Sequence, residues 1–344
     1  MRVAVAGYGY WGPNVARALA GLIGPADVLV CERRPDRLRQ AALDLPGIEC
    51  MEGWPEVLQR ADINAIALCT PASTHFALAS QALAAGKHLL VEKPAVTSTA
   101  EALALTADAQ RRHRVLMAGH VFRYLPAARL LRSLIQSGRL GDLRYLYSDR
   151  TSLGPRARED VSVVWDYLIH DAYLLPWLID RPARSVRAAG GAYLRPGVQD
   201  VAFAHWDFGA GVIACSRASW CDPEKVRRLV VVGSMGMAVL DDLQPAARLT
   251  FFRRGYEPYE GIDPFGNQGL RLFDGGGEVL ASGDEQPLGE ECRAFLAAVQ
   301  QERAPPEARD EIITTTAACE AVERSLETGL PERVAQGQFV EAVA

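Results

Sequence analysis

Short apolar runs alternate with amphipathic segments over the first third of the chain. The apolar runs have the length of buried strands and lie at residues 2–6, 28–31, 65–69, 88–91 and 115–118. The segments between them have helical periodicity and lie at residues 12–20, 35–45, 75–85 and 98–112. Strands that alternate with helices pair in parallel, because a parallel neighbour is reached only through a crossover connection. This pattern predicts a doubly wound α/β Rossmann domain over residues 1–119.

The pattern changes beyond residue 119. Helical periodicity is found at residues 126–137, 164–179, 290–301 and 311–327. Segments that alternate between apolar and polar residues lie at residues 202–208, 211–218, 226–232 and 247–253, with Gly, Pro and Asp turns between them. We therefore predict an α+β domain with a large, mostly antiparallel open sheet over residues 120–344.

Composition and charge narrow the class of protein. A chain of 344 residues with 49% hydrophobic residues is typical of two globular domains. The net charge of −5 gives no basic field for a phosphate backbone, so we expect no nucleic-acid partner. The seven cysteines form no C-x-x-C pair, and we expect no metal site. Neither a signal peptide nor an apolar run of membrane-spanning length is recognisable, which favours a cytoplasmic protein without a membrane partner.

A glycine-rich loop follows the first predicted strand. The segment Gly7-Tyr8-Gly9-Tyr10-Trp11-Gly12 matches G-x-G-x-x-G between a strand and a helix. Glycines let backbone amides approach a pyrophosphate, and the helix N-terminus offers it a partial positive charge. Because glycine loops also form ordinary tight turns, the hexapeptide needs support from a second feature.

That second feature is Glu32, which ends the second predicted strand at about the spacing of 20 residues expected of a ribose-binding carboxylate. A carboxylate there favours NAD(H), since it would repel the 2′-phosphate of NADP(H). Arg33 and Arg34 leave NADP(H) open as the alternative, because either could stack on adenine or neutralise that phosphate, or simply be solvated. The sequence thus predicts a dinucleotide site with NAD(H) preferred.

Further candidates follow the later strands of the same domain. Thr70-Pro71 follows the predicted strand 65–69, and Glu92-Lys93-Pro94 follows the strand 88–91. The carboxyl ends of parallel strands are where α/β sheets bind ligands, so both segments are candidate cofactor contacts. His75 and His120 are weaker candidates for the same cleft. Lys93 would stabilise negative charge on a reacting oxygen, unless it is only a surface lysine at a strand end.

A second group of candidates lies on the predicted helix 164–179. Trp165, Asp166 and His170 fall in an apolar stretch, and the four-residue spacing of the last two puts them on one helical face. A histidine can exchange a proton with a hydroxyl oxygen, and a carboxylate beside it can fix its tautomer. The alternative is a core histidine bonded to the backbone.

Taken together, these motifs resemble the Gfo/Idh/MocA family, the group of glucose-fructose oxidoreductase and inositol dehydrogenase. The matching pieces occur in the family's order and are Gly7 to Gly12, Thr70-Pro71 with His75, Glu92-Lys93-Pro94, and Asp166 with His170. Segments 152–155, 219–225 and 232–237, followed by Asp241-Asp242, are similar to the branch that contains dehydrogenases of UDP-N-acetylglucosaminuronic acid at the 3-hydroxyl and sugar 3-ketoreductases.

The resemblance implies an enzyme that transfers hydride between nicotinamide and a secondary hydroxyl or ketone of a sugar or nucleotide-sugar. It implies that Lys93 polarises the oxygen, that His170 is the general acid or base, and that Asp166 orients His170 or binds substrate. It also implies a homodimer or homotetramer that assembles through the open sheet of the second domain, which would otherwise expose apolar side chains.

Several residues near the predicted site are candidate contacts for the substrate. Arginines near the predicted site could bind a carboxylate or diphosphate, and the candidate substrate contacts are Arg123, Tyr124, Arg150, Trp165, Asp166 and His170, with Arg156 and Arg158 nearby. The chain departs from the family pattern at Leu125, where we expect asparagine, and at Cys221, where we expect leucine. Two other functions stay open: reduction of an imine or non-sugar carbonyl, and a cofactor-binding regulator without catalysis.

Overall fold

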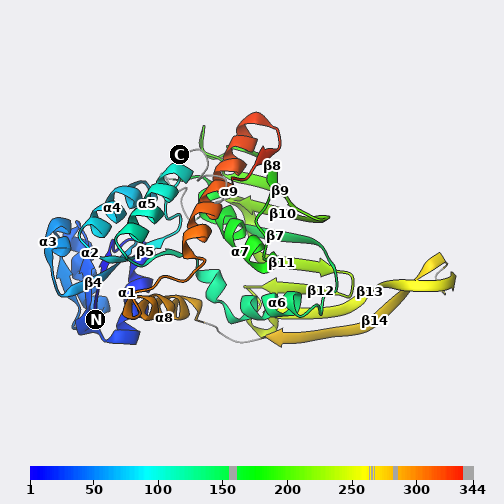
Figure 1. Cartoon of the computed structure of the whole chain (residues 1–344), viewed down its shortest axis with the longest axis horizontal. Coiled ribbons are helices and arrows are strands. Elements are labelled where there is room, and N and C mark those ends of the chain that lie inside the picture. Colours follow the sequence, from blue (N-terminus) through cyan, green and yellow to red (C-terminus); the bar gives the residue numbers. More distant parts are fainter. Residues whose placement is uncertain (155–160, 263, 265, 267, 282–285, 336–344) are drawn as a thin grey trace. The chain divides into compact units, whose positions relative to one another are not determined.

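A computed structural model describes residues 1–154, 161–262, 264, 266, 268–281 and 286–335 (Figure 1). Contacts divide the chain into two units. Unit 1 contains Met1–Tyr124 and Gln286–Glu320, and unit 2 contains Leu125–Glu285 and Ala321–Ala335. The sequence pattern placed the boundary at residue 119 and assigned everything beyond it to the second domain. The contacts instead return residues 286–320 to unit 1, because helix α8 (Pro287–Gln300) packs against α1 (Gly12–Ile23).

Unit 1 is built on a parallel sheet with the strand order β3-β2-β1-β4-β5-β6. Its strands are β1 (Arg2–Ala6), β2 (Val28–Cys31), β3 (Glu49–Met51), β4 (Ile63–Leu68), β5 (His88–Glu92) and β6 (Leu116–Gly119). Every neighbouring pair is parallel. The order reverses between β1 and β4, and ligands of doubly wound sheets bind at the carboxyl side of such a switch point.

Helices cover both faces of this sheet (Figure 1). They are α1, α2 (Pro35–Asp44), α3 (Trp54–Gln59), α4 (His75–Ala84), α5 (Thr99–Arg111), α8 and the first part of α9 (Ala308–Thr328), with short 3-10 turns η1 (Pro25–Asp27), η2 (Ala72–Thr74) and η3 (Val121–Tyr124). Val3 and Val5 pack with Phe295 on one face, whereas Ala4 packs with Leu83 on the other. Alternate strand residues therefore serve two cores, which is why these strands read as continuous apolar runs.

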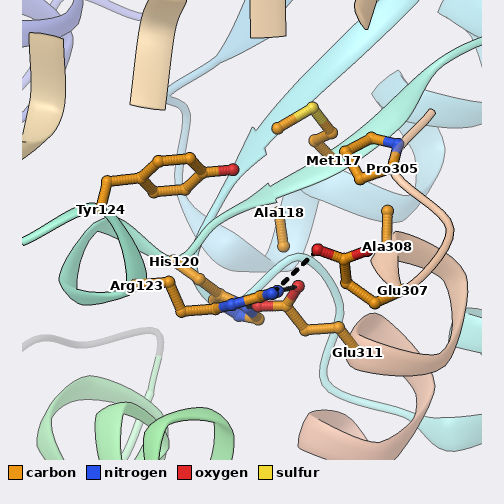
Figure 2. A pocket seen from close by; sticks show the side chains of 9 residues that line it. All are labelled: Met117, Ala118, His120, Arg123, Tyr124, Pro305, Glu307, Ala308 and Glu311. Carbon is orange, nitrogen blue, oxygen red and sulfur yellow. Dashed lines mark hydrogen bonds and ion pairs between the residues drawn. The ribbon is translucent and has the colours of Figure 1, made fainter. Parts of the chain in front are cut away.

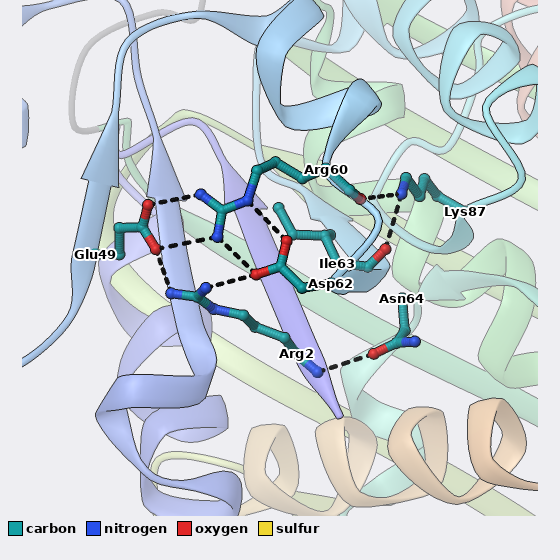
Figure 3. A network of polar contacts seen from close by, with 7 residues as sticks. All are labelled: Arg2, Glu49, Arg60, Asp62, Ile63, Asn64 and Lys87. Carbon is teal, nitrogen blue, oxygen red and sulfur yellow. Dashed lines mark hydrogen bonds and ion pairs between the residues drawn. The ribbon is translucent and has the colours of Figure 1, made fainter.

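An ion-pair network ties the amino ends of the strands together, at the edge opposite the glycine loop (Figure 3). The Arg60 guanidinium contacts Glu49 at 2.7 Å and Asp62 at 2.6 Å, and Arg2 contacts the same two carboxylates. Lys87 donates to the Ile63 carbonyl at 2.8 Å. Hydrogen bonds from the arginines hold the pKa values of Asp62 and Glu49 below their usual range. Because the charged groups of this network pair with one another across β1, β3 and the segment before β4, its role is to fix the strand ends.

Unit 2 contains a second, larger sheet with the strand order β14-β13-β12-β11-β7-β10-β9-β8-β15. Its strands are β7 (Leu143–Leu153), β8 (Ser185–Gly191), β9 (Val201–Gly209), β10 (Val212–Ser219), β11 (Cys221–Gly233), β12 (Met237–Asp241), β13 (Leu249–Ile262), β14 (Gln268–Ala281) and β15 (Glu332–Arg333). Among the described strands of this second sheet, only β7 and β10 pair in parallel. The predicted fold class, a Rossmann domain followed by a mostly antiparallel open sheet, is confirmed.

The two faces of the second sheet differ. One face is covered by α6 (Pro126–Gln136), by the π-helical turn η4 (Val164–Leu168) and by α7 (Ile169–Ile179), and a 3-10 turn, η5 (Pro245–Ala247), follows β12. Buried residues on β9, such as Trp206, alternate with exposed ones, such as Phe203. Within the described residues, the outer face carries large exposed side chains that include Tyr145, Tyr147, Phe203 and Ile213.

The described residues contain neither a candidate membrane-spanning helix nor a candidate metal-binding cluster. No helix in the described ranges is both long enough and apolar enough to cross a membrane. A cluster of three or more His, Cys, Asp or Glu side chains that could hold a metal ion is likewise absent from that part of the chain.

Candidate active site

The glycine loop leaves β1 at the switch point, and its backbone is packed closely. Gly7 has a φ of +95°, and a Cβ built on it would lie 2.8 Å from the Cys69 carbonyl oxygen. Gly12 begins α1, and a Cβ there would lie 2.0 Å from the Gly7 carbonyl oxygen. Gly9 differs, because a Cβ built on it would have no neighbouring atom within 4 Å. Two glycines are thus required for the turn, and the third leaves open space beside the start of α1.

The Glu32 carboxylate is bound to this loop. Its Oε2 accepts the Tyr8 N–H at 2.9 Å and its Oε1 accepts the Arg34 N–H at 3.1 Å. The Glu32 side chain is only 11% exposed, whereas Arg33 and Tyr10 are exposed. Trp11 packs against the core that contains Val3, Val5 and Phe295. Each carboxylate oxygen keeps a second lone pair. A fixed carboxylate, glycine backbone and a helix N-terminus at one edge fit a dinucleotide.

Tyr8 anchors the glycine loop to α2, a role that the sequence pattern did not indicate. Its ring is fully buried, and its hydroxyl donates to Asp44 on α2 at 3.0 Å. Burial and this hydrogen bond raise the pKa of Tyr8 to about 12. The phenol therefore stays neutral and holds the loop against α2.

His75 joins the segments that follow β4 and β5. Its Nδ1 lies 2.8 Å from the Pro94 carbonyl oxygen and its Nε2 lies 2.9 Å from the Thr70 carbonyl oxygen. The ring is 1% exposed. His75 thus connects the Thr70-Pro71 segment to the Glu92-Lys93-Pro94 segment, in which the Lys93-Pro94 peptide is cis.

Lys93 follows β5 at the carboxyl edge of the sheet. The Glu92 carboxylate accepts the Lys93 backbone N–H at 3.2 Å and lies against Gly119, where a Cβ would come within 3.0 Å of it. The Lys93 charge acts on His120, which follows β6. Lys93 is half-buried and is held by its neighbours at the edge where the glycine loop lies.

A small pocket lies where β6 meets the start of α9, and Figure 2 shows the side chains that line it. His120 Nδ1 lies 2.6 Å from Glu311, while Arg123 pairs with Glu311 and, at 3.0 Å, with Glu307. Burial, Arg123 and Lys93 lower the pKa of His120 well below its usual value. The Arg123 guanidinium, a predicted substrate contact, is engaged by two carboxylates of its own unit, and Tyr124 lines the same pocket.

Glu291 on α8 was not predicted from the sequence. It is fully buried, and neither carboxyl oxygen has a hydrogen-bond partner among the described residues. Burial and the nearby Glu92 raise its pKa well above the usual range, and burial is also the main cause of the raised pKa values of Cys69 and Cys292. A neutral carboxyl group therefore lies close to the segment that leads into Lys93.

The predicted residues Asp166 and His170 both belong to unit 2. Asp166 lies in η4 and accepts the Trp220 indole N–H at 3.2 Å. His170 is the second residue of α7, and its Nδ1 lies 2.9 Å from the hydroxyl of Tyr173. The sequence predicted helix throughout 164–179, whereas Val164–Leu168 is a π-helix, a wider turn that is frequent at functional sites.

The other predicted substrate contacts of unit 2 are buried. Trp165 is 3% exposed. Arg150 on β7 is 5% exposed, and its Nε donates to Asp171 at 2.9 Å, where the Ser148 hydroxyl also donates at 2.9 Å. The Arg150–Asp171 pair connects α7 to the sheet, and Asp171 is the residue directly after His170. Arg156 and Arg158 lie outside the described residues.

Comparison with known proteins decides the family. A model described as an oxidoreductase family with an NAD-binding Rossmann fold matches residues 1–120, and the GFO/IDH/MocA C-terminal domain matches residues 128–239. The chain belongs to the Gfo/Idh/MocA oxidoreductase family. Its relatives in this family include the UDP-N-acetylglucosamine 3-dehydrogenase of Acidithiobacillus ferrooxidans, which is 34% identical over 263 residues, 76% of this chain and 80% of that protein.

Two further comparisons agree with the family assignment. A solved structure of the same Acidithiobacillus ferrooxidans enzyme matches 95% of this chain and 97% of its own, with 30% identity and a TM-score of 0.79. The dTDP-3,4-didehydro-2,6-dideoxy-alpha-D-glucose 3-reductase of Streptomyces violaceoruber is 33% identical over 132 residues, which is 38% of each protein. The family recognised from the motifs is therefore confirmed.

Proposed function

We propose that this protein is an NAD(H)-dependent oxidoreductase that transfers hydride between nicotinamide and C3 of a nucleotide-sugar. The observation that carries the proposal is the placing of the glycine loop, Glu32 and Lys93 at the carboxyl edge of one parallel sheet. Relatives named for oxidation or reduction of a nucleotide-sugar at C3 support the substrate class. Secondary alcohol and ketone are the two states that such a reaction interconverts.

Lys93 of unit 1 has the charge that this reaction needs. When bound, the nicotinamide accepts or supplies the hydride. Loss of hydride and proton from a carbinol passes through a state in which negative charge grows on the oxygen. An ammonium group held at the carboxyl edge stabilises that charge and orients the oxygen.

His170 of unit 2 has a side chain suited to proton transfer. In the direction of oxidation its ring would take the hydroxyl proton, and in the direction of reduction it would return that proton to the carbonyl oxygen. Asp166, fixed by Trp220, would bind a substrate hydroxyl or orient the imidazole. The same two groups serve both directions, so they do not determine which one the cell uses.

We propose NAD(H) over NADP(H) as the cofactor because of Glu32. Its carboxylate is fixed by the Tyr8 and Arg34 amides, so it cannot swing away from a ribose placed beside the loop. A ribose 2′-hydroxyl could donate to it, whereas a 2′-phosphate would meet a like charge.

The proposed activity is tested by absorbance at the nicotinamide band. NAD is mixed with UDP-sugars, dTDP-sugars, free hexoses and inositols in separate reactions, each repeated with Lys93→Ala. We expect a signal with a nucleotide-sugar that falls in the variant while NADH binding persists. A signal only with free hexoses or inositols, or none with any compound while NADH binds, would reject the proposal.

We also propose that a second copy of the chain covers the outer face of the unit 2 sheet. Tyr145, Phe203 and Ile213 are 44%, 42% and 56% exposed on adjacent strands, and exposed apolar groups of this size favour association. Ile213→Asp should convert the oligomer to monomer in analytical ultracentrifugation. A monomeric wild-type protein, or a variant with unchanged mass, would reject the interface.

A further inference from the structure

The contact between His170 and Tyr173 bears on how the proposed base is prepared. Tyr173 lies one helical turn after His170 on α7, and its side chain is 2% exposed. The two rings meet edge to face, with centroids 5.7 Å apart and an interplanar angle of 77°. The phenol oxygen lies 2.9 Å from Nδ1 of the imidazole. Burial of the phenol fixes its position, so this contact also fixes the rotation of the His170 ring.

We propose that Tyr173 is a positioning residue that selects the tautomer of His170. The proposal rests on the proposed function, because it takes His170 to be the acid or base. With Nδ1 directed at Tyr173, the nitrogen that exchanges a proton with substrate is Nε2. A neutral imidazole can accept there only if its single proton is on Nδ1. In the proposed arrangement the phenol oxygen accepts the Nδ1–H, which favours this tautomer over the one in which the phenol O–H donates to Nδ1.

The proton balance is the same throughout the reaction. During oxidation the Nε2 lone pair takes the hydroxyl proton, and the imidazolium then carries N–H on both nitrogens. The Nδ1–H points at the phenol oxygen before and after this transfer, so the phenol need not rotate. During reduction the Nε2 proton leaves to the carbonyl oxygen, and the Nδ1-protonated imidazole is restored. Tyr173 itself gains and loses no proton.

A tyrosine differs from a carboxylate in this position because it adds no charge. It stabilises the imidazolium through one charge-assisted hydrogen bond, since a charged N–H is the stronger donor. Charged groups on the elements around α7 make contacts of their own: Arg150 of β7 with Asp171, Arg132 of α6 with Asp180, Arg227 of β11 with Tyr167, and Asp166 with Trp220.

The test substitutes Tyr173→Phe, which keeps the buried ring and removes the acceptor. Tyr167→Phe is the matched control, because it deletes a hydroxyl of the same helical segment that contacts Ser152 at 2.8 Å instead. Nitrogen-15 spectra of the histidine side chains, with His170 assigned by its absence in His170→Gln, report the tautomer without substrate. We expect a protonated Nδ1 in neutral His170 of the wild type and the control, and a shift toward a protonated Nε2 in Tyr173→Phe.

Kinetics with UDP-N-acetylglucosamine and NAD supply the second measurement. We expect Tyr173→Phe to lower kcat about tenfold, because one hydrogen bond to a charged group is lost. The acidic limb of kcat/KM in the direction of oxidation should move about one unit to lower pH, since the imidazolium loses its acceptor. KM for NAD and the melting temperature should stay unchanged.

The outcomes separate this inference from the function on which it rests. If His170→Ala keeps full turnover, the acid or base role is wrong and the inference falls with it. If His170→Ala loses turnover but Tyr173→Phe changes neither the tautomer nor the pH profile, only the inference is overturned. A wild-type spectrum with Nε2 protonated in neutral His170 overturns it whatever the kinetics.

Discussion

Removing the charge of Asp171 should destabilise unit 2 strongly. Asp171 is 1% exposed and accepts from Arg150, which is 5% exposed, and from the Ser148 hydroxyl. Asp171→Asn removes the charge of the Asp171 carboxylate that contacts the buried Arg150 guanidinium, and breaking a buried pair in this way costs about 3–5 kcal/mol. For a unit of this size each kcal/mol lowers the melting temperature by about 2–4 °C. We therefore expect a decrease of about 6–20 °C.

Tryptophan fluorescence during heating is a suitable assay. Four of the six tryptophans belong to unit 2, namely Trp165, Trp177, Trp206 and Trp220. Asp274→Asn is the matched control, because Asp274 pairs with Arg254 at the surface, where the side chains are 49% and 59% exposed. Exposed pairs contribute about 0–1 kcal/mol, so this variant should melt within a few degrees of the wild type.

A double variant tests the cause. Replacing Arg150 and Asp171 together by Met and Leu removes both charges and refills the volume, which is often neutral for a buried pair. The double variant should therefore melt above Asp171→Asn. The reasoning is refuted if Asp171→Asn melts like the surface control, or if the double variant melts at or below the temperature of Asp171→Asn.

Three further predictions concern unit 1. Glu32→Gln should weaken NADH binding about tenfold, by loss of a charged acceptor, and should bring NADPH closer to NADH in a fluorescence titration. Gly12→Ala should abolish NADH binding, because its Cβ would meet the Gly7 carbonyl oxygen at 2.0 Å, whereas Gly21→Ala on the same helix meets nothing within 4 Å and should add about 0.5–1 kcal/mol of stability. In the folded protein Glu291 keeps its proton, whereas in the unfolded chain it releases that proton above about pH 4.3. The free energy of unfolding of the wild type should therefore decrease as the pH rises above this value. Glu291→Met should remove this pH dependence, as measured by denaturation curves at several pH values.

Each of these predictions has a contradicting result. An unchanged preference between NADH and NADPH in Glu32→Gln would reject the assigned role of its charge. Equal NADH binding by Gly12→Ala and Gly21→Ala would show that the close approach is not needed. Parallel pH curves for the wild type and Glu291→Met would mean that the buried carboxyl does not hold its proton.

The Rossmann unit could be predicted because its strands are buried on both faces and its loop carries glycines that a close backbone approach requires. Three strands of the unit 2 sheet were harder to predict. On β7 the buried face carries Ser148 and Arg150, so the apolar alternation is hidden. Most of β13 and β14 beyond Phe252 is exposed, which leaves no buried face to reveal a strand. The return of α8 to unit 1 depends on contacts with α1 that no local pattern contains.

The sequence motifs proposed candidate residues by type, but they did not indicate the partners that these residues contact in the structure. The motifs indicated Lys93, Asp166 and His170, yet the contact of His170 with Tyr173 depends on how α7 is rotated. Arg150 looked like a substrate contact because its counter-charge, Asp171, is distant in sequence. One feature of the sequence could have indicated Glu291. It lies on the apolar stripe of α8 between Leu288 and Phe295, where a carboxylate needs an explanation.

The most direct test of the proposed reaction follows the hydride itself. UDP-N-acetylglucosamine labelled with deuterium at C3 is incubated with NAD and the protein, and the reduced nicotinamide is examined by mass spectrometry. The account predicts transfer of deuterium to the nicotinamide and its loss from C3. Reduced nicotinamide without deuterium would place the oxidation at another carbon, and absence of reduced nicotinamide, with NAD bound, would contradict oxidation of this nucleotide-sugar.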